Sequence, residues 1–470
     1  MAGVVKTPKI PVPEPVQGIV KAVAKESGKA ILVGGYVRDH LLGIGSKDAD
    51  VEVFHVSLET LERILARFGE VNRVGRAFAV LKVKGIEGDF SIPRHDSKTG
   101  PGHKGFSVGI APDIEFEEAA RRRDLTINSI GYDPVAETFL DPFHGRKDLE
   151  AKVLRATDPR HFAEDPLRGL RVADFAARFD MQPDPELERL CSELDLSELP
   201  PERILVELDK ILLKAPRPSV AFRFLEKVGL LRFFPEIEAL SGVPQEADWH
   251  PEGDVFVHTM MVIDEAALLR RGDAEDRPLM YGALCHDFGK PVTTESVDGR
   301  IRSRGHDTAG VAIAEGFLER LRAPNELVIQ VAALVQHHLA PGLYSRMGAK
   351  PNAFRRLARE LESASVTMEL LLRVATADSF GRTTPEARKR RFEEGDQFRQ
   401  QMEALDLEEE GPRDAVQGRH LIARGFAPGK HFREILARCR EVQDQTGWDD
   451  PQKILDEVMR YSPSNHPIQG

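Results

Sequence analysis

Two aspartates separated by one residue, Asp48 and Asp50, have the spacing that most directly suggests chemistry in this sequence. The alternation of polar and apolar residues over 48–53 predicts a strand that carries Asp48, Asp50 and Glu52 on one face. Two carboxylates on one face provide the oxygen ligands that Mg²⁺ prefers. Because an ordinary polar strand face has the same pattern, the interpretation depends on the residues that come before it.

A pair of glycines in residues 34–39 (GGYVRD) precedes these aspartates. The apolar run at 30–33 predicts a buried strand before the glycines, and residues 37–42 predict one or two helical turns after them. A strand, a tight turn and a helix start place free backbone N–H groups where a phosphate can bind. Followed by Asp48 and Asp50, this stretch predicts Mg²⁺-dependent nucleotidyl transfer.

A second group of residues with metal-binding chemistry begins near residue 250. In chain order it contains His258, His286, Asp287, His306, His337, His338 and Asp378. Imidazole and carboxylate ligands suit a divalent metal that keeps positions open to water. Core histidines are common and a lone His-Asp pair would carry little weight, so it is the complete order that predicts a metal site.

Composition limits the class of protein. The 470 residues are 41% hydrophobic and 30% charged, which is typical of a globular protein of several domains. We find no apolar run long enough to span a membrane, no signal peptide, and no disulfide or metal spacing among Cys191, Cys285 and Cys439. We therefore expect a cytoplasmic protein with no membrane partner. The net charge of −11 means that RNA would have to bind at a local basic surface.

Residues 34–39, 42–43 and 48–51 together resemble the signature of class II tRNA nucleotidyltransferases, the CCA-adding enzymes. Bacterial poly(A) polymerases and A-adding enzymes share this signature. The resemblance implies a head domain with a mixed five-stranded sheet, in which Asp48 and Asp50 are catalytic and bind Mg²⁺.

The same resemblance assigns roles to further residues of the head. It implies that Gly35 and Arg38 contact the nucleotide. Family members carry a third acidic metal ligand on a later strand, and Asp89 is our candidate, although it could simply flank a turn. The polar segment 93–106 is expected to be a mobile loop, whose basic residues could meet phosphates or the RNA end.

Residues 121–128 (RRRDLTIN) resemble a second motif of this family. Arg123 offers a fork for triphosphate oxygens, and Asp124 and Asn128 could read ribose hydroxyls. The other interpretation is the end of a helix whose basic residues suit its dipole.

Residues 164–171 (EDPLRGLR) resemble the motif that serves the family as a protein template for CTP and ATP. Asp165 and Arg168, at i and i+3, can act as one edge that accepts from an exocyclic amine and donates to a ring nitrogen. Cytosine and adenine fit this edge, whereas uracil and guanine present a carbonyl to the carboxylate. Arg171 is expected to bind the nucleotide as well. The other interpretation is a capped helix with an internal salt bridge.

The order His258, His286, Asp287, Asp378 resembles the HD-domain phosphohydrolases. This implies an HD fold that binds a divalent metal through these four residues. Together the patterns predict an α+β chain, with an extended arm (1–15), a nucleotidyltransferase head (16–155), a helical neck that binds nucleotide and RNA (156–245), an HD domain (246–400) and a helical tail (405–470).

The interpretation we favour is a tRNA nucleotidyltransferase that adds CCA from CTP and ATP by two-metal chemistry, with a second phosphohydrolase activity in the HD domain. An A-adding enzyme or a poly(A) polymerase has the same head residues and stays open. An HD phosphatase or phosphodiesterase whose head only delivers RNA is a further alternative, against which Asp48 and Asp50 argue. Two complete sets of candidate metal-ligand residues argue against a non-catalytic RNA-binding protein.

Overall fold

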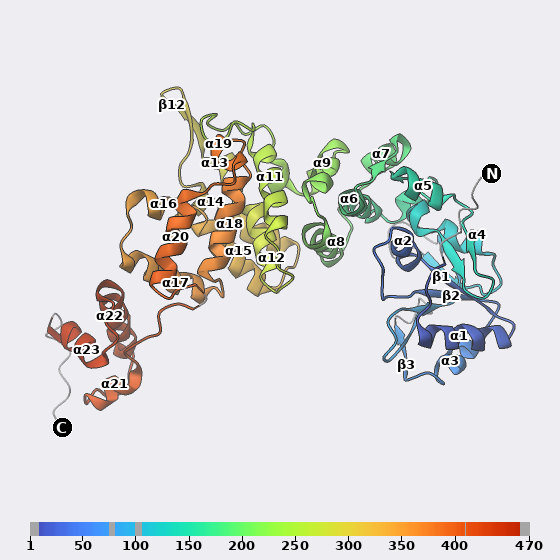
Figure 1. Ribbon diagram of the computed structural model, residues 1–470, viewed down its shortest axis with the longest axis horizontal. Helices are drawn as coiled ribbons and strands as arrows, with labels where there is room; N and C mark the ends of the chain where they lie inside the picture. The colour runs from blue at the N-terminus through green and yellow to red at the C-terminus, as the bar shows by residue number, and fades with distance from the viewer. Residues whose placement is uncertain (1–8, 75–79, 99–105, 409, 461–470) are drawn as a thin grey trace. The chain divides into compact units, whose positions relative to one another are not determined.

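The computed structural model describes residues 9–74, 80–98, 106–408 and 410–460 (Figure 1). The chain forms two compact units, one of Met1–Glu207 with Phe224–Phe233, the other of Leu208–Arg223 with Phe234–Gly470. The large sheet lies in the first unit, and the second is mostly helical. The predicted α+β class is therefore confirmed. None of the described helices is long and apolar enough to cross a membrane.

A mixed sheet forms the centre of the first unit. Its seven described strands have the order β3-β4-β5-β2-β1-β8-β9, in which β2 and β5 are parallel. The expected number was five, and the short edge hairpin of β8 and β9 was not foreseen. The bounds are β1 Lys29–Val33, β2 Val51–Phe54, β3 Val71–Val74, β4 Val80–Val83, β5 Phe90–Ser91, β8 Gly131–Asp133 and β9 Thr138–Leu140.

Amphipathic helices cover this sheet through their apolar residues. The helices α1 (Glu14–Lys25) and α3 (Leu58–Leu65) pack against each other in Figure 1 and bury residues at helical spacing. Helix α3 begins after Ser57, whose hydroxyl accepts from the Thr60 N–H as an N-cap, as the sequence predicts. Helix α1 begins at Glu14, so the extended arm ends earlier than predicted, because Pro15 fits the first helical turn.

The predicted loop over 93–106 is partly a hairpin. Strands β6 (Arg94–Lys98) and β7 (Phe106–Ile110) pair in antiparallel register. Backbone pairing needs no apolar side chains, so the polar composition concealed these strands. The remaining elements of the first unit include α2 Gly35–Leu41, α4 Phe116–Arg121, α5 Gly145–Ala151, β10 Val153–Leu154, α6 Arg168–Phe179, β11 Gln182–Pro183 and α7 Pro185–Ser192. The division between the units runs through α8 (Pro201–Lys214) and α9 (Ser219–Lys227).

The core of the second unit consists of helices buried on most sides. Helices α11, α12 and α18 contact one another, and α15 packs on α12 and α14. Their bounds are α11 Val255–Leu268, α12 Asp276–Cys285, α14 His306–Arg320, α15 Asn325–His337 and α18 Met368–Phe380. Around them lie α10 Pro235–Glu238, α13 Lys290–Thr293, β12 Thr294–Val297, β13 Arg300–Ser303, α16 Ala340–Met347, α17 Pro351–Ser363, α19 Pro385–Arg388 and α20 Glu393–Ala404.

The end of the chain has a small hydrophobic cluster of its own. Helices α21 (Gly418–Ala423), α22 (His431–Thr446) and α23 (Pro451–Arg460) contribute its buried residues, such as Leu421, Ile435 and Ile454. A helical tail was predicted here.

Candidate nucleotidyl-transfer and metal sites

The three predicted Mg²⁺ ligands of the head lie in neighbouring segments at the start of β2, close enough for their charges to act on one another. The sequence predicted that Asp48 and Asp50 lie on a strand. Strand β2 begins at Val51, however, so both aspartates lie in the segment that leads into it. The Asp89 N–H donates to Asp50 Oδ1 at 3.1 Å. Burial raises the pKa of Asp50 to about 6, and the charges of Asp48 and Asp89 act in the same direction. A divalent cation would relieve this crowding of negative charge, so the residues fit Mg²⁺.

A glycine makes this close approach possible. Gly88 has a φ of +125°, and a Cβ at this position would lie 2.3 Å from the carbonyl oxygen of Ala49. The absence of a side chain thus lets the chain before Asp89 pass against the chain before Asp50. On the other side of Asp89, its carboxylate pairs with Lys82 at 2.9 Å.

The alternating pattern predicted that Glu52 lies on the same strand face as Asp48 and Asp50, and in the structure Glu52 pairs with two arginines. Its side chain is buried and pairs with Arg122 at 3.2 Å and with Arg123 at 2.9 Å. Arg123 also donates to the carbonyl oxygen of Asn128 at 3.0 Å. Glu52 therefore positions the arginine that we expect to meet triphosphate oxygens.

Four other predicted nucleotide ligands form one buried network. Arg38 donates to Asn128 Oδ1 at 2.6 Å, and Asn128 Nδ2 donates to Asp124 Oδ1 at 2.9 Å. Arg171 Nε donates to Asp124 Oδ2 at 2.7 Å. Burial alone raises the pKa of Asp124, but Arg171 and the hydrogen bonds outweigh it and lower the value to about 2. The network fixes the second motif against α6 before any nucleotide binds.

Arg38 also links the glycine turn to α6. The turn has the predicted form, with Gly34 at a φ of +67° and α2 beginning at Gly35. The guanidinium of Arg38 lies over the rings of Phe175 and Phe179, at 5.0 and 4.7 Å from their centroids. These contacts bury Arg38, so in this structure it supports the site and does not face an open cavity.

The predicted base-reading pair, Asp165 and Arg168, is held from several directions. Arg203 donates to Asp165 Oδ2 at 2.9 Å, and the Leu167 N–H donates to Asp165 Oδ1 at 3.2 Å. Arg168 donates to the backbone carbonyl oxygens of His161 and Arg122 at 2.8 and 2.6 Å. Fixed side chains of this kind are what recognition of a base edge requires.

In the second unit, the predicted HD ligands converge from separate helices. His258 comes from α11, His286 and Asp287 from the end of α12, and Asp378 from α18. The His258 Nε2 atom lies 3.1 Å from Asp378 Oδ1, and His286 Nε2 lies 3.1 Å from Asp287 Oδ2. All four side chains are buried. Among the described residues, groups of three ligand atoms within 4.8 Å of one another occur in this unit and not in the head.

Two of the extra histidines join this cluster and the third does not. His306 begins α14 and His338 caps α15, and their Nε2 atoms lie 3.2 Å apart. Burial lowers the pKa of His338 to about 3, which keeps its ring neutral as a metal ligand must be. The ring of His337 instead lies 3.6 Å from Glu360.

Two cations that the sequence reasoning missed contact the buried carboxylates. Lys290 lies 2.7 Å from Asp287 Oδ2, and Arg382 lies 2.8 Å from Asp378 Oδ1. Burial raises the pKa of Asp287, but His286 and Lys290 outweigh it and hold the pKa well below its usual range. Asp287 is therefore ionised. The sequence signal for Lys290 was present in the turn that follows His286 and Asp287.

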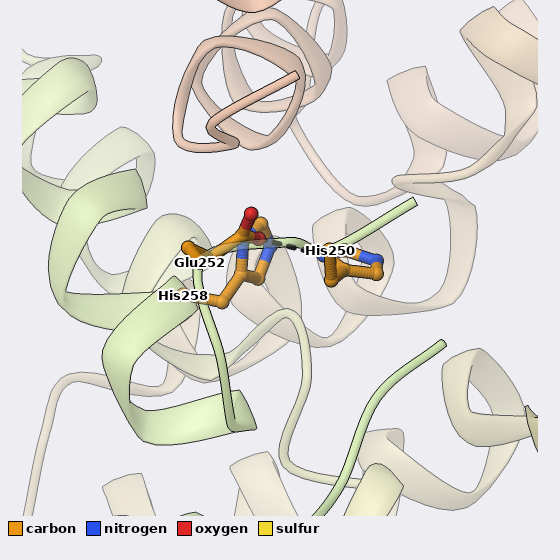
Figure 2. A group of neighbouring side chains, drawn as sticks. All are labelled: His250, Glu252 and His258. Atoms are coloured by element: carbon orange, nitrogen blue, oxygen red, sulfur yellow. Dashed lines mark hydrogen bonds and ion pairs between the residues drawn. The ribbon is translucent and has the colours of Figure 1, made fainter. Parts of the chain in front are cut away.

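Glu252 is a further residue that was not foreseen. Figure 2 shows its carboxylate between the rings of His250 and His258, with each Nδ1 atom 2.9 Å from Oε1. Burial raises the pKa of Glu252, but these two contacts outweigh it and hold the pKa below its usual range. A carboxylate on Nδ1 turns Nε2 of His258 towards Asp378 and fixes the tautomer that binds metals. Glu252 thus positions a ligand from outside the cluster.

The cluster opens into a cavity of about 240 Å³. Asp287, His306 and His338 lie in its wall, together with the cations Lys290, Arg346 and Arg382 and the aromatic ring of Trp249. Buried carboxylates and histidines beneath cationic walls suit a metal-bound anionic substrate.

These features define the class of protein as a nucleotidyltransferase-type head joined to a helical HD region. Residues 30–155 match the model of the poly(A) polymerase head domain, 181–240 that of a probable RNA- and SrmB-binding site of polymerase A, and 255–380 that of the HD domain. These three matches agree in order and position with the resemblance that the sequence shows to the poly(A) polymerases and class II tRNA nucleotidyltransferases with an HD domain.

Solved structures with the same fold extend over nearly the whole chain. The Bacillus stearothermophilus CCA-adding enzyme in complex with CTP has 21% identity and a TM-score of 0.67, covering 96% of this chain and 99% of that one. The Thermotoga maritima CCA-adding enzyme complexed with tRNA has 18% identity and a TM-score of 0.58, with 96% of each chain covered. A CCA-adding enzyme with ATP has 19% identity and a TM-score of 0.61, covering 97% of this chain and 96% of the other.

Proposed function

We propose that this protein adds the nucleotides C, C and A to the 3′ end of tRNA, from CTP and ATP and without a nucleic-acid template. The observation that carries the proposal is the position of Asp50, which the Asp89 N–H and the charges of Asp48 and Asp89 reach, and whose backbone carbonyl oxygen accepts from the Val33 N–H directly before the glycine turn. The similar solved structures named above are of CCA-adding enzymes with CTP, ATP or tRNA, which supports the choice of substrates. We expect the reaction to take place in the cytoplasm.

We assign a separate role to each group of residues in the head. Asp48, Asp50 and Asp89 would hold Mg²⁺. Bound Mg²⁺ supplies activation of the primer hydroxyl and stabilisation of the leaving pyrophosphate. Arg123, oriented by Glu52, contacts the triphosphate. The other predicted nucleotide ligands of the head, which form the network around Asp124, hold the segment of Arg123 in place.

Asp165 and Arg168 select the base. Asp165 accepts a hydrogen bond from the exocyclic amine of cytosine or adenine, while Arg203 holds its carboxylate in place. Arg168 donates to the ring nitrogen beside that amine.

Incubation with tRNA that lacks CCA tests the proposal. Purified protein receives CTP alone, ATP alone, or both with Mg²⁺, and the products are sequenced. Addition of CC with CTP and of CCA with both nucleotides is expected. Addition of A only, or of a long A tail, would replace the proposal by an A-adding enzyme or a poly(A) polymerase.

A second activity, hydrolysis of a phosphate ester in the HD region, is favoured by the convergence of His258, His286, Asp287 and Asp378 below a cationic cavity. Among the described residues, buried His286 Nε2 and Asp287 Oδ1 make no hydrogen bond of good geometry, although His286 Nε2 lies 3.1 Å from Asp287 Oδ2, so the donor set fits a divalent metal. Assays with 2′,3′-cyclic nucleotides and phosphomonoesters, each with Mg²⁺, Mn²⁺ or Ni²⁺, test this activity. Absence of turnover with every metal would contradict it.

A further inference from the structure

A lysine to which the proposed function gives no role lies at the predicted Mg²⁺ ligands of the head. The Nζ atom of Lys82 lies 2.9 Å from Oδ1 of Asp89. Strand β4 pairs antiparallel with β5, with Leu81 opposite Phe90, so the next pair in this register is Lys82 and Asp89. The sheet itself therefore brings the ammonium group to the carboxylate.

The contact between Lys82 and Asp89 is an ion pair that can open. Oδ1 of Asp89 is buried, and among the described residues it accepts no hydrogen bond of good geometry. The side chain of Lys82 is 54% exposed. The backbone of Asp89 is fixed, because its N–H donates to Asp50 Oδ1 at 3.1 Å and its carbonyl oxygen accepts from the Val51 N–H at 2.8 Å. Lys82 can thus turn away while Asp89 stays in place.

The same ammonium group acts on all three carboxylates of the predicted site. The charges of Asp48 and Asp50 reach Lys82, as does the charge of its direct partner Asp89. A divalent ion held by these carboxylates would be repelled by the positive charge of Lys82. The lysine and the ion therefore compete for the same negative charge.

A nucleoside triphosphate changes this balance. Its phosphate oxygens bind a divalent ion, and they also accept hydrogen bonds from an ammonium group. The negative charge of the triphosphate therefore offsets the repulsion between Lys82 and the ion. The ion should then bind more tightly together with the nucleotide than alone.

We infer that Lys82 couples the binding of the divalent ion in the head to the binding of the nucleotide. By competing for Asp89, Lys82 keeps the affinity of the head for the free ion low, and the triphosphate restores that affinity. The inference rests on the proposed function for the identity of the ion and of the nucleotide. It concerns binding alone, so it can be measured without tRNA.

Equilibrium dialysis of the full-length protein at set concentrations of free Mn²⁺, with and without CTP, tests this inference. The double variant Asp48→Asn with Asp50→Asn reports the Mn²⁺ that binds elsewhere in the chain, and this amount is subtracted. Without CTP, Lys82→Gln should bind Mn²⁺ roughly three- to tenfold more tightly than the wild type, because an exposed charge has a modest effect. The gain in Mn²⁺ affinity that CTP confers should be smaller in Lys82→Gln than in the wild type.

Two further variants separate this role from a general effect of charge. Lys84→Gln removes an exposed lysine two residues further along the chain, whose partner is Glu70, and should leave the Mn²⁺ affinity unchanged with and without CTP. Lys82→Arg keeps the positive charge and should keep the gain that CTP confers.

Three results would overturn the inference. The first is Mn²⁺ binding by natively folded Lys82→Gln, without CTP, that is as weak as in the wild type or weaker, which would mean that the lysine supports the carboxylate. The second is an equal tightening in Lys84→Gln. The third is an unchanged gain from CTP in Lys82→Gln.

The outcome for nucleotide transfer is separate. If the protein adds no nucleotide to tRNA but its Mn²⁺ binding depends on CTP through Lys82, the inference stands and the proposed transfer activity fails. If the protein adds CCA and Lys82→Gln keeps the wild-type gain from CTP, the proposed function stands and the inference fails.

Discussion

Asp50 is half-buried beside Asp48 and Asp89, and burial raises its pKa from an ordinary value of 3.8 to about 6. Because the folded-state pKa is above the unfolded one, the ionised carboxylate destabilises the fold. That cost is absent below about pH 4, grows between about pH 4 and pH 6, and stays constant at higher pH. A partly buried carboxylate that lowers stability when it is ionised is typical of a functional site.

Asp50→Asn should therefore stabilise the protein at pH 8 in the absence of divalent ions. The expected gain is on the order of 3 kcal/mol, because the pKa rises from 3.8 to about 6 and each unit of pKa shift corresponds to about 1.4 kcal/mol. Thermal unfolding at pH 8 and pH 4 measures it, and the difference should vanish at pH 4. Asp48→Asn is the matched control, since Asp48 is exposed and should change stability little. Equal melting temperatures of Asp50→Asn and wild type at pH 8 would contradict this account.

Asp165→Ala should change which nucleotide is added and not only the rate. The substitution removes the acceptor for the exocyclic amine, so UTP becomes a relatively better substrate. A lost charge-assisted hydrogen bond costs about 1.5–3 kcal/mol, which corresponds to a roughly ten- to hundredfold fall in discrimination. The measurement is kcat/KM for CTP, ATP and UTP on one tRNA primer.

Glu164→Gln is the control for this change, because Glu164 contacts His161 at the surface and no base-reading role is assigned to it. Equal slowing of Asp165→Ala with all three nucleotides, and an unchanged ratio of CTP to UTP, would leave Asp165 with a purely structural role.

At the scale of single residues, the sequence predicts ligand types better than their partners. Asp48, Asp50 and the HD residues were predicted as ligands from local spacing and chain order, and the HD residues lie together in the structure. Glu52 was predicted only to share a strand face with Asp48 and Asp50, and its partners Arg122 and Arg123 were missed because they lie 70 and 71 residues further along the chain. Contacts at such separations depend on how strands and helices pack, and one sequence does not reveal them.

At the scale of elements, the position of α11 determines where His258 lies. Asp254 caps this helix by accepting from the Val257 N–H at 2.8 Å, and its other oxygen accepts from the Gly242 N–H at 2.6 Å. One side chain thus joins the start of α11 to the preceding segment. A sequence can predict that an aspartate at such a position caps the helix. The contact of Asp254 with the Gly242 N–H is visible only in the folded structure.

Asp254→Ala should destabilise the second unit by about 1–2 kcal/mol, because the N–H groups at the helix start lose their acceptor. Asp254→Asn keeps an oxygen acceptor for Val257 and should lose less. Urea unfolding followed by circular dichroism measures both variants. A loss in Asp254→Asn as large as that in Asp254→Ala would show that the charge, and not the cap, matters.

At the scale of the whole molecule, the two proposed sites lie in different compact units. The head carboxylates belong to the unit that includes Met1–Glu207, and the HD cluster to the unit that includes Phe234–Gly470. Each unit has its own buried hydrophobic residues and its own group of candidate metal ligands. The five-segment division predicted from the sequence stays a prediction, since the helical neck contributes residues to both units.

Separate centres in separate units should be separable by mutation. Asp48→Asn should lower CCA addition by at least a hundredfold and leave hydrolysis by the HD region unchanged, because its side chain is exposed and supports no core. Asp287→Asn should do the reverse, because it removes the carboxylate shared by His286 and His306. Both activities are measured on the same preparations, with melting curves as the check on folding. If natively folded Asp287→Asn lost nucleotide addition as well, the two centres would be coupled and their assignment to independent activities would be wrong.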